Sequence, residues 1–165
     1  MKKRDFVIYA GCILFVLLSY FCFRGAKIHG TSMEPTLHKK DILLVERVSP
    51  KSHYDRYDII IFRTGNMFSR KFIKRIIGLP GETVRISDGK IYINGSALDE
   101  SYGQGTNCPA DMEEKTLTLG RNEYFVLGDN RENSLDSRYD AIGPVSADKI
   151  VGRAWCRIWP IKIFH

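Results

Sequence analysis

A mostly β fold, preceded by one N-terminal transmembrane helix, is the fold class that the sequence of 165 residues predicts. The first observation is an uncharged apolar run from Phe6 to Phe23. The second is that short apolar or alternating runs, bounded by turn residues, recur through the rest of the chain, as is typical of β-strands. The third is that no stretch after Phe23 carries the period of a long amphipathic helix. We therefore expect an antiparallel β-rich domain with a small inserted subdomain.

The N-terminal apolar run is long enough to cross a bilayer. A helix over residues 6–23 rises about 27 Å, close to the hydrocarbon thickness of a membrane. A cleaved secretory signal is the alternative, but its apolar part is usually shorter and ends at small residues, whereas this run ends in Phe23-Arg24. A buried soluble helix fits less well, because the run is apolar on every face. We expect an uncleaved anchor over 6–23.

Charge around the anchor predicts its orientation. Lys2, Lys3 and Arg4 precede it, and the positive-inside rule keeps such residues in the cytoplasm. Two basic residues shortly after the anchor weaken this bias. We expect a cytoplasmic N-terminus over residues 1–5 and an extracytoplasmic domain over residues 24–165, in a single-pass protein of the cytoplasmic membrane.

The strands expected in that domain are short and separated by turns. Turn dipeptides at Asp88-Gly89 and Asn94-Gly95 bracket one of them and favour hairpins there. The segment at about 94–120 is polar and rich in Gly, Ser, Asp and Glu, so we interpret it as the insertion or small subdomain on the β core. The expected strands lie within 42–45, 58–62, 68–77, 84–86, 90–93, 124–127 and 150–158.

Composition excludes some classes of function. The formal net charge is +6, but bases and acids are interspersed and no nucleic-acid motif is present, so we expect no nucleic-acid partner. Contact with anionic lipid headgroups explains the charge better than solubility alone. The four Cys and four His show no metal-ligand spacing, so we expect no metal or other cofactor. Cys108 and Cys156 could pair outside the cell; spacing does not decide it, and we favour unpaired thiols.

Candidate chemistry starts at Ser32, in the loop sequence Gly30-Thr31-Ser32-Met33-Glu34-Pro35. Flanking Gly and Pro constrain that loop, and serine becomes a good nucleophile only when a base takes its proton. Lys74 could be that base, because Phe72, Ile73 and neighbouring isoleucines surround it in sequence and burial disfavours the ammonium form. On a strand, Phe72 and Lys74 share one face.

Each of these features alone is weak evidence. A lysine in an apolar strand usually packs its stem while its head reaches water, and a serine before Met-x-Pro is more often a turn residue. His29 and His38 also lie close to Ser32 in sequence. Because histidine is the commoner base, the residues alone rank a Ser-His pair ahead of a Ser-Lys pair.

Three matches in order along the chain change that ranking. They are Ser-Met-x-Pro-Thr-Leu at residues 32–37, Lys-Arg-Ile-Ile-Gly-Leu-Pro-Gly at 74–81, and Gly-Asp-Asn-Arg-x-Asn-Ser-x-Asp-Ser-Arg at 128–138. Together they resemble the bacterial type I signal peptidases, or leader peptidases, and the short length and single anchor resemble their compact type. The resemblance covers the whole chain.

The resemblance implies an enzyme that removes signal peptides from exported preproteins at the outer membrane face through an acyl-enzyme. It implies Ser32 as nucleophile, Lys74 as general base and Ser134 as the hydroxyl that orients the lysine amine. Further charged residues would pair to hold the site together, namely Arg75, Asp129, Asp136 and Arg138. The expected walls of the substrate pocket are Ile28, Met33, Phe72 and Ile73, with a core position equally expected for Met33.

One departure from the family and several rival functions remain. Some members carry a hydroxyl residue two positions before the nucleophile as an oxyanion donor, and here that residue is Gly30. A self-cleaving Ser-Lys repressor would need a DNA-binding domain, which the sequence before Ser32 does not resemble. A processing peptidase for one dedicated substrate, such as a conjugation pilin, stays open, as does an inactive membrane-tethered binding module. We expect a monomer that contacts membrane lipid.

Overall fold

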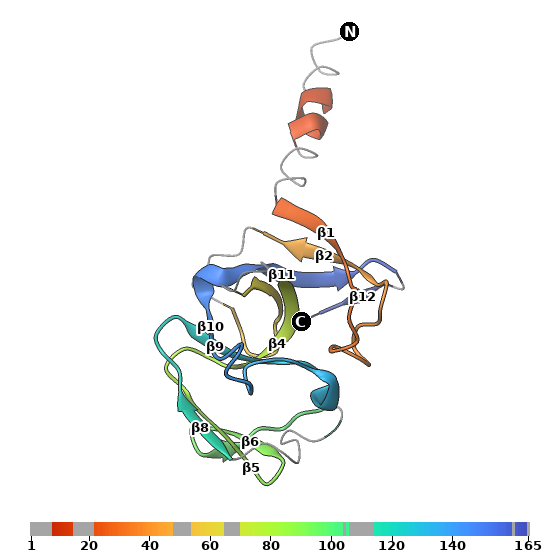
Figure 1. The fold of residues 1–165 in the computed structure, drawn as a ribbon. Helices are drawn as coiled ribbons and strands as arrows, with labels where there is room; N and C mark the ends of the chain where they lie inside the picture. Colours follow the sequence, from red (N-terminus) through yellow and green to blue (C-terminus); the bar gives the residue numbers. More distant parts are fainter. Residues whose placement is uncertain are drawn as a thin grey trace.

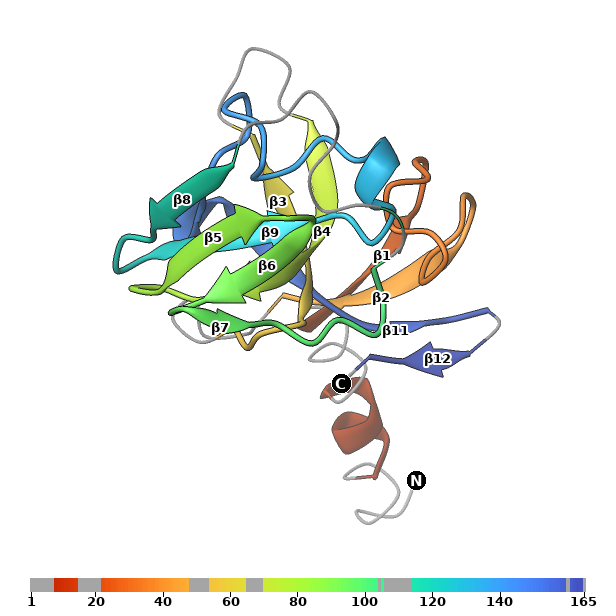
Figure 2. The same cartoon turned by 90° about the horizontal axis from the view of Figure 1, so that it is seen from below.

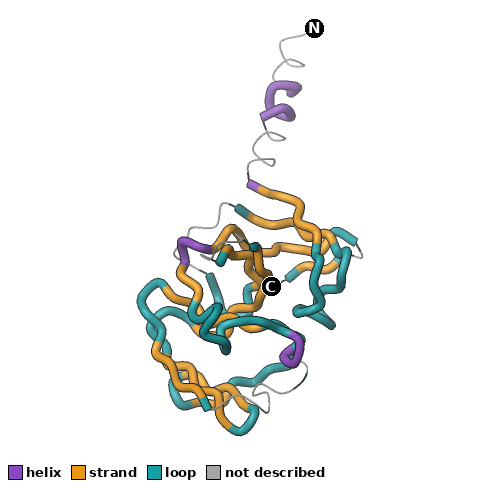
Figure 3. Tube along the Cα trace, viewed as in Figure 1, coloured by secondary structure: helices purple, strands orange, loops and turns teal. Residues whose placement is uncertain are grey.

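Two antiparallel sheets form the protein in the computed structural model, which describes residues 8–14, 22–47, 54–64, 70–103, 105, 114–159 and 161–164. Figure 1 and Figure 2 show the sheets from two directions, and Figure 3 shows that strands and loops make up most of the described chain. The expectation of a mostly antiparallel β fold is confirmed.

The larger sheet contains eight strands of the described chain in the order β1-β2-β11-β3-β4-β9-β10, with β12 paired to β11. β1 is therefore an edge strand, and β4 lies in the interior between β3 and β9. The strands are β1 (Phe23–Lys27), β2 (Ile42–Glu46), β3 (Ile59–Arg63), β4 (Lys71–Gly78), β9 (Glu123–Leu127), β10 (Val145–Ser146), β11 (Ile150–Arg157) and β12 (Lys162–Ile163). Two short 3-10 helices among the described residues are η1 (Arg131–Asn133) and η2 (Ala147–Lys149).

The smaller sheet has the order β7-β6-β5-β8. β7 and β8 fall inside the polar segment that the sequence sets apart at about 94–120, and they pair with β6 and β5, which precede it. Its strands are β5 (Thr83–Ser87), β6 (Lys90–Ile93), β7 (Ser96–Ala97) and β8 (Lys115–Thr118).

The two sheets meet at one apolar cluster. Ile77 of β4 and Phe125 of β9 are buried there against Val84 and Ile86 of β5. The packing leaves no room for a side chain at Gly78, where a Cβ atom would lie 2.7 Å from Val84 Cγ2 and 2.8 Å from Leu119 Cδ1. Glycine is therefore required at the point where β4 passes from one sheet toward the other.

The N-terminal segment of the described chain is helical at residues 8–14 and at Cys22, and β1 begins at Phe23. Phe23, the last residue of the expected anchor, is thus part of the sheet. No helix within the described residues is both long and apolar enough to span a membrane. The rest of the expected anchor and Cys108 of the considered disulfide lie outside the described residues.

Candidate active site

The loop between β1 and β2 holds Ser32 in a fixed position. Its two ends are tied together, because Ile28 N donates to Asp41 O at 2.9 Å and Lys40 N donates to Ile28 O at 2.9 Å. Within the loop, Met33 is 1% exposed and Leu37 is fully buried, and both pack in the same core cluster. Burial of these two side chains anchors the loop on the sheet and leaves Ser32 half-buried at its surface.

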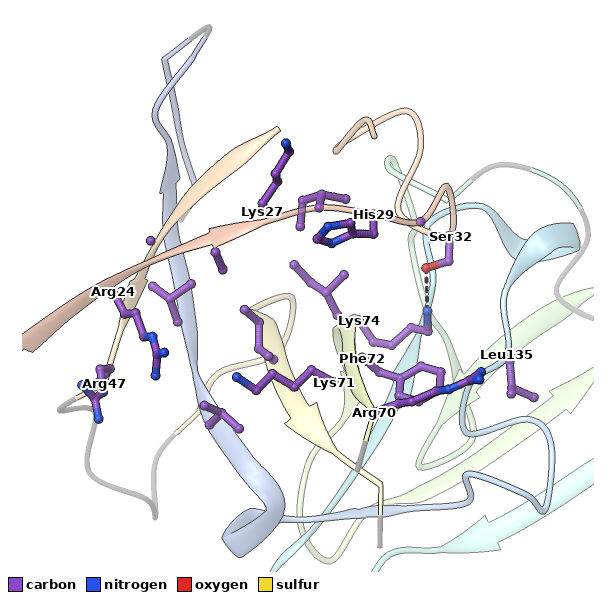
Figure 4. A pocket seen from close by; sticks show the side chains of 18 residues that line it. Arg24, Lys27, His29, Ser32, Arg47, Arg70, Lys71, Phe72, Lys74 and Leu135 are labelled. Carbon is purple, nitrogen blue, oxygen red and sulfur yellow. Dashed lines mark hydrogen bonds between the residues drawn. The ribbon is translucent and has the colours of Figure 1, made fainter. Parts of the chain in front are cut away.

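Lys74 lies in the middle of β4, opposite Ile60 of β3. Its side chain is 2% exposed. Figure 4 shows the chain reaching across to Ser32, and Lys74 Nζ donates to Ser32 Oγ at 2.6 Å. The structure therefore brings together the two groups that lie 42 positions apart in the sequence. Among the described residues, no carboxylate lies within ion-pair distance of this amine.

The surroundings of Lys74 favour its neutral form. Burial lowers the pKa of its amine from 10.5 to about 8, because desolvation penalises the ammonium ion. The charge of Arg138 lowers it further, while Asp136 and Asp129 act in the opposite direction. A neutral amine can accept the Ser32 proton along the same 2.6 Å line, so the geometry suits a hydroxyl activated by a lysine base.

Arg75, the residue after Lys74, joins β4 to three loops through hydrogen bonds. Its Nε and Nη2 atoms donate to Asp129 at 2.8 and 2.6 Å, and Asp129 is fully buried. Arg75 Nη1 also donates to Tyr57 O at 3.1 Å, and Nη2 lies 3.4 Å from Thr36 Oγ1 in the Ser32 loop. This bidentate, buried pair is the strong form of an ion pair.

A second buried ion pair joins Asp136 to Arg138 in the segment after β9. Arg138 Nε donates to Asp136 Oδ1 at 2.8 Å, and Nη2 donates to Oδ2 at 3.0 Å. Ser134 Oγ donates to the same Oδ2 atom at 2.6 Å. The structure therefore places Ser134, Asp136 and Arg138 in one network, in which the hydroxyl of Ser134 is bonded to the carboxylate. Within the described chain, no hydrogen bond joins Ser134 to the Lys74 amine.

Residues that sequence reasoning did not single out complete this network. A Cβ atom at Gly128 would lie 2.2 Å from Ser134 Oγ and 2.5 Å from Ser32 O, so only glycine fits where these two segments meet. Asn130 N donates to Ser32 O at 3.1 Å. Arg131 Nε donates to Gly128 O at 3.0 Å. All three belong to the Gly-Asp-Asn-Arg segment at residues 128–131. Their place in that motif was the sequence feature that could have pointed to them.

Glu100 was outside every motif. It forms two hydrogen bonds with the Arg131 guanidinium, one of them at 3.0 Å from Nη1 to Oε2. The two side chains are 10% and 2% exposed. Tyr102 lies close by, with its ring 4.3 Å from the Arg75 guanidinium carbon. The segment that follows β7 thus packs against the ion-pair network behind the Ser32–Lys74 dyad. This contact could be found only from the tertiary structure.

An open groove of about 630 Å³ leads away from the dyad between β1 and the first half of β4 (Figure 4). Ile28, Phe72 and Ile73 line it, as expected for the pocket, and Ile73 and Phe72 also pack against the two core clusters of the larger sheet. β9 pairs with β4 only from Arg75 onward. Within the described chain, residues 71–74 therefore have a neighbouring strand on the β3 side alone.

Met33, the fourth expected pocket residue, lies in the core and is not among the described residues that line the groove. His29 lines the groove and His38 is exposed, but in the described chain neither imidazole is hydrogen-bonded to Ser32. Gly30 also lines the groove, and a Cβ atom there would meet nothing within 4 Å. No cluster of metal-ligating side chains is present among the described residues.

A serine hydroxyl bonded to a buried lysine amine at the end of an open groove is the arrangement of the serine hydrolases that use lysine as general base. A family model described as "Signal peptidase, peptidase S26" matches residues 3–159. The chain belongs to this signal peptidase family.

Curated relatives and a solved structure agree with that membership. A probable signal peptidase I-2 of Synechocystis is 40% identical over 155 residues, which cover 90% of this chain and 69% of the relative. Signal peptidase I T of Bacillus subtilis is 37% identical over 158 residues, covering 91% and 81%. The crystal structure of a signal peptidase I from Enterococcus faecalis aligns with a TM-score of 0.51 at 37% identity, covering 61% of this chain and 96% of that one.

Proposed function

We propose that the protein is a membrane-bound serine endopeptidase that removes N-terminal signal peptides from exported proteins at the outer face of the cytoplasmic membrane. The observation that carries the proposal is the 2.6 Å hydrogen bond between Ser32 Oγ and the buried Lys74 amine. Membership of the signal peptidase family and the names of the relatives supply the substrate class.

The reaction starts when neutral Lys74 takes the Ser32 proton. Ser32 Oγ then forms a bond to the carbonyl carbon of the scissile peptide, and the carbonyl π electrons move to the oxygen. When that tetrahedral intermediate collapses, the C–N bond breaks and the Lys74 ammonium gives its proton to the departing amine. Lys74, neutral again, takes a proton from water as the water oxygen bonds to the acyl carbon. The bond from that carbon to Ser32 Oγ then breaks, Ser32 Oγ takes the proton back from the Lys74 ammonium, and the signal peptide leaves as a carboxylic acid.

The oxyanion needs donors at the Ser32 end of the groove. The backbone N–H of Ser32 is one, because it is adjacent to the reacting hydroxyl. Gly30 carries no hydroxyl that could be a second, although the open space around its Cα would admit one. Loss of one such donor typically costs about 10²–10³ in rate, so this position affects the absolute rate of the enzyme.

The buried ion pairs have a positioning role. Arg75–Asp129 joins the strand that carries Lys74 to the segment after β9 and reaches Thr36 in the Ser32 loop. Asp136 accepts from both Arg138 and Ser134, directly beside Gly128 and Ser32 O. The distance between the two reacting groups is therefore held by the network and does not depend on the stem of Lys74 alone.

The substrate binds as an extended strand in the groove. Residues 71–74 of β4 and the outer edge of β1 both lack a second neighbouring strand within the described chain, so their backbone groups can pair with a peptide laid between them. Ile28, Phe72 and Ile73 supply apolar walls for small side chains just before the cut.

A membrane anchor within residues 6–22, ending where β1 begins at Phe23, holds this site close to the bilayer, because Ser32 follows Phe23 by nine residues, which reach at most about 30 Å. Trp159 is 79% exposed and Ile161 77%, in the β11–β12 hairpin. Phe23 at the start of β1 contacts Trp155 of that hairpin, with ring centroids 5.7 Å apart. Exposed tryptophans and isoleucines beside the anchor suit the membrane interface.

Incubation of the detergent-solubilised protein with a secretory precursor tests the proposal. Wild type and the control Ser96→Ala, an exposed serine on β7, should cut after a small residue, and Ser32→Ala should not. Mass spectrometry maps the cut. Because Lys74 must be neutral, kcat/KM should rise about tenfold per pH unit below pH 8 and level off above it. Cleavage by Ser32→Ala, or a rate independent of pH from 6 to 9, would contradict the proposal.

A further inference from the structure

The groove that leads to Ser32 carries charge of one sign. Besides Lys74, five basic side chains line it, and no acidic residue is among the described residues that do so. The five are Arg24, Lys27, Arg47, Arg70 and Lys71. Arg24, Arg47 and Lys71 are exposed, and within the described chain none of these three takes part in an ion pair. A concave site lined by one sign of charge concentrates ions of the opposite sign.

The cations lie along the path of the substrate. Figure 4 shows Ser32 and Lys74 at one end of the groove, Arg24 and Arg47 at the other, and Lys71 between them. Arg24 lies near the start of β1, and Arg47 directly follows the end of β2. Arg47 N donates to Cys22 O at 2.7 Å. They therefore mark the end of the groove that is next to the N-terminal helix.

The spacing of residues along an extended strand indicates which substrate residue each cation lies beside. Lys71 precedes Lys74 by three residues on β4, and Arg24 precedes Ser32 by eight. An extended substrate advances about 3.3 Å per residue, as the enzyme strands do. Lys71 therefore lies beside a substrate residue about three from the cut. Arg24 lies on β1, which ends at Lys27 before the Ser32 loop, so it lies beside a substrate residue at most about eight from the cut.

We propose that this groove selects signal peptides that carry a carboxylate between about three and eight residues before the cut, and that Arg24, Arg47 and Lys71 recognise it. The inference rests on the proposed function, because the residues before the cut lie toward the membrane and hence toward the anchor side. Lipid headgroups are the other possible anions. The three side chains line the same cavity as the dyad, which favours a group delivered by the substrate.

Three peptides that differ only at the fifth residue before the cut, with Glu, Gln or Lys, test the proposal in non-ionic detergent without lipid. We expect kcat/KM to fall in the order Glu, Gln, Lys, with about two- to fivefold at each step, as for exposed ion pairs. The differences should shrink in 0.5 M salt, because screening weakens exposed pairs.

Matched variants assign the effect to the groove. In Arg24→Gln/Arg47→Gln/Lys71→Gln the ratio of Glu to Gln peptide should approach one. In Lys90→Gln/Arg121→Gln/Lys149→Gln, which removes the same charge from exposed residues outside the groove, the ratio should stay as in wild type. Equal cleavage of the three peptides by wild type overturns the inference, as does a ratio that both triple variants lose alike.

A vesicle-binding experiment distinguishes a substrate carboxylate from a lipid headgroup as the anion that the groove binds. If the groove variant loses binding to vesicles of phosphatidylglycerol while wild type cleaves all three peptides equally, the cations serve headgroups and the inference is wrong. Failure to cut the Gln peptide at the expected site, in wild type at pH 8, would instead contradict the proposed function itself.

Discussion

Three buried arginines lie behind the Ser32–Lys74 pair, and each binds a carboxylate: Arg75 with Asp129, Arg131 with Glu100, and Arg138 with Asp136. Three basic residues in front of the pair, Arg24, Arg47 and Lys71, are exposed and have no ion pair within the described chain. The same type of charge is thus used in two ways within one domain.

Burial explains the difference. A buried guanidinium without a partner costs several kcal/mol, so the network must satisfy its cations from within and thereby fixes the loops that carry them. An exposed cation is solvated and needs no protein partner, so it stays available to a ligand. Lys74 is a third case, because it is buried and no carboxylate among the described residues contacts it, so that burial lowers the pKa of its amine.

Replacement of Lys74 by Met gives the largest expected effect. Cleavage should fall by about 10²–10⁴-fold, the usual contribution of a general base. Stability at pH 7 should rise, on the order of 1–3 kcal/mol, because a pKa lowered from 10.5 to about 8 means that the protonated amine destabilises the fold. Lys90→Met, at an exposed position on β6, is the matched control for both readouts.

The sign of the pH dependence sharpens this test. Between pH 8 and 10.5 the unfolded chain binds the Lys74 proton more than the folded chain does, so wild-type stability gains with rising pH in that window. The stability advantage of Lys74→Met should therefore shrink from pH 8 to 10.5, as urea unfolding can measure. A variant that is less stable than wild type at pH 7 would show that the amine stabilises the fold.

Glu100→Gln should reveal how much the network depends on paired charge. The substitution leaves the Arg131 guanidinium buried beside a neutral amide, and loss of one partner of a buried pair typically costs about 3–5 kcal/mol. Asp140→Asn breaks the Lys115–Asp140 pair, whose carboxylate is fully exposed, and should change stability little. Equal urea midpoints for the two variants would argue that Glu100 is not structurally important.

Single replacements of the groove cations give the smallest expected effect. Arg47→Gln and Lys71→Gln should each change the free energy of unfolding by less than about 0.5 kcal/mol, as is usual for surface positions. Any change should be a gain at low salt, because like charges in the groove repel each other. If either variant lost as much stability as Glu100→Gln, the distinction between the two regions would be wrong.

Local patterns in the sequence were sufficient for most of the sheet. Alternating or apolar runs predicted the bounds of seven strands to within a few residues, namely β2, β3, β4, β5, β6, β9 and β11. Such strands are predictable because burial of every second residue produces a matching alternation in the sequence. β1 was missed, because Phe-Arg-Gly-Ala-Lys has no clear alternation and becomes a strand only by pairing with β2. β7 and β8 were hidden in a polar segment for the same reason.

The sequence by itself supplied three motifs whose resemblance to the signal peptidases predicts Ser32 and Lys74 as the reacting pair, whereas the residues alone ranked a Ser-His pair first. Tertiary structure alone decided that Lys74 is buried, that the Ser134 hydroxyl donates a hydrogen bond to Asp136, and that Glu100 forms an ion pair with Arg131. The physical reason is that pKa, ion pairing and the charge of a groove depend on which distant segments meet in space. Spacing along a chain carries no measure of that distance.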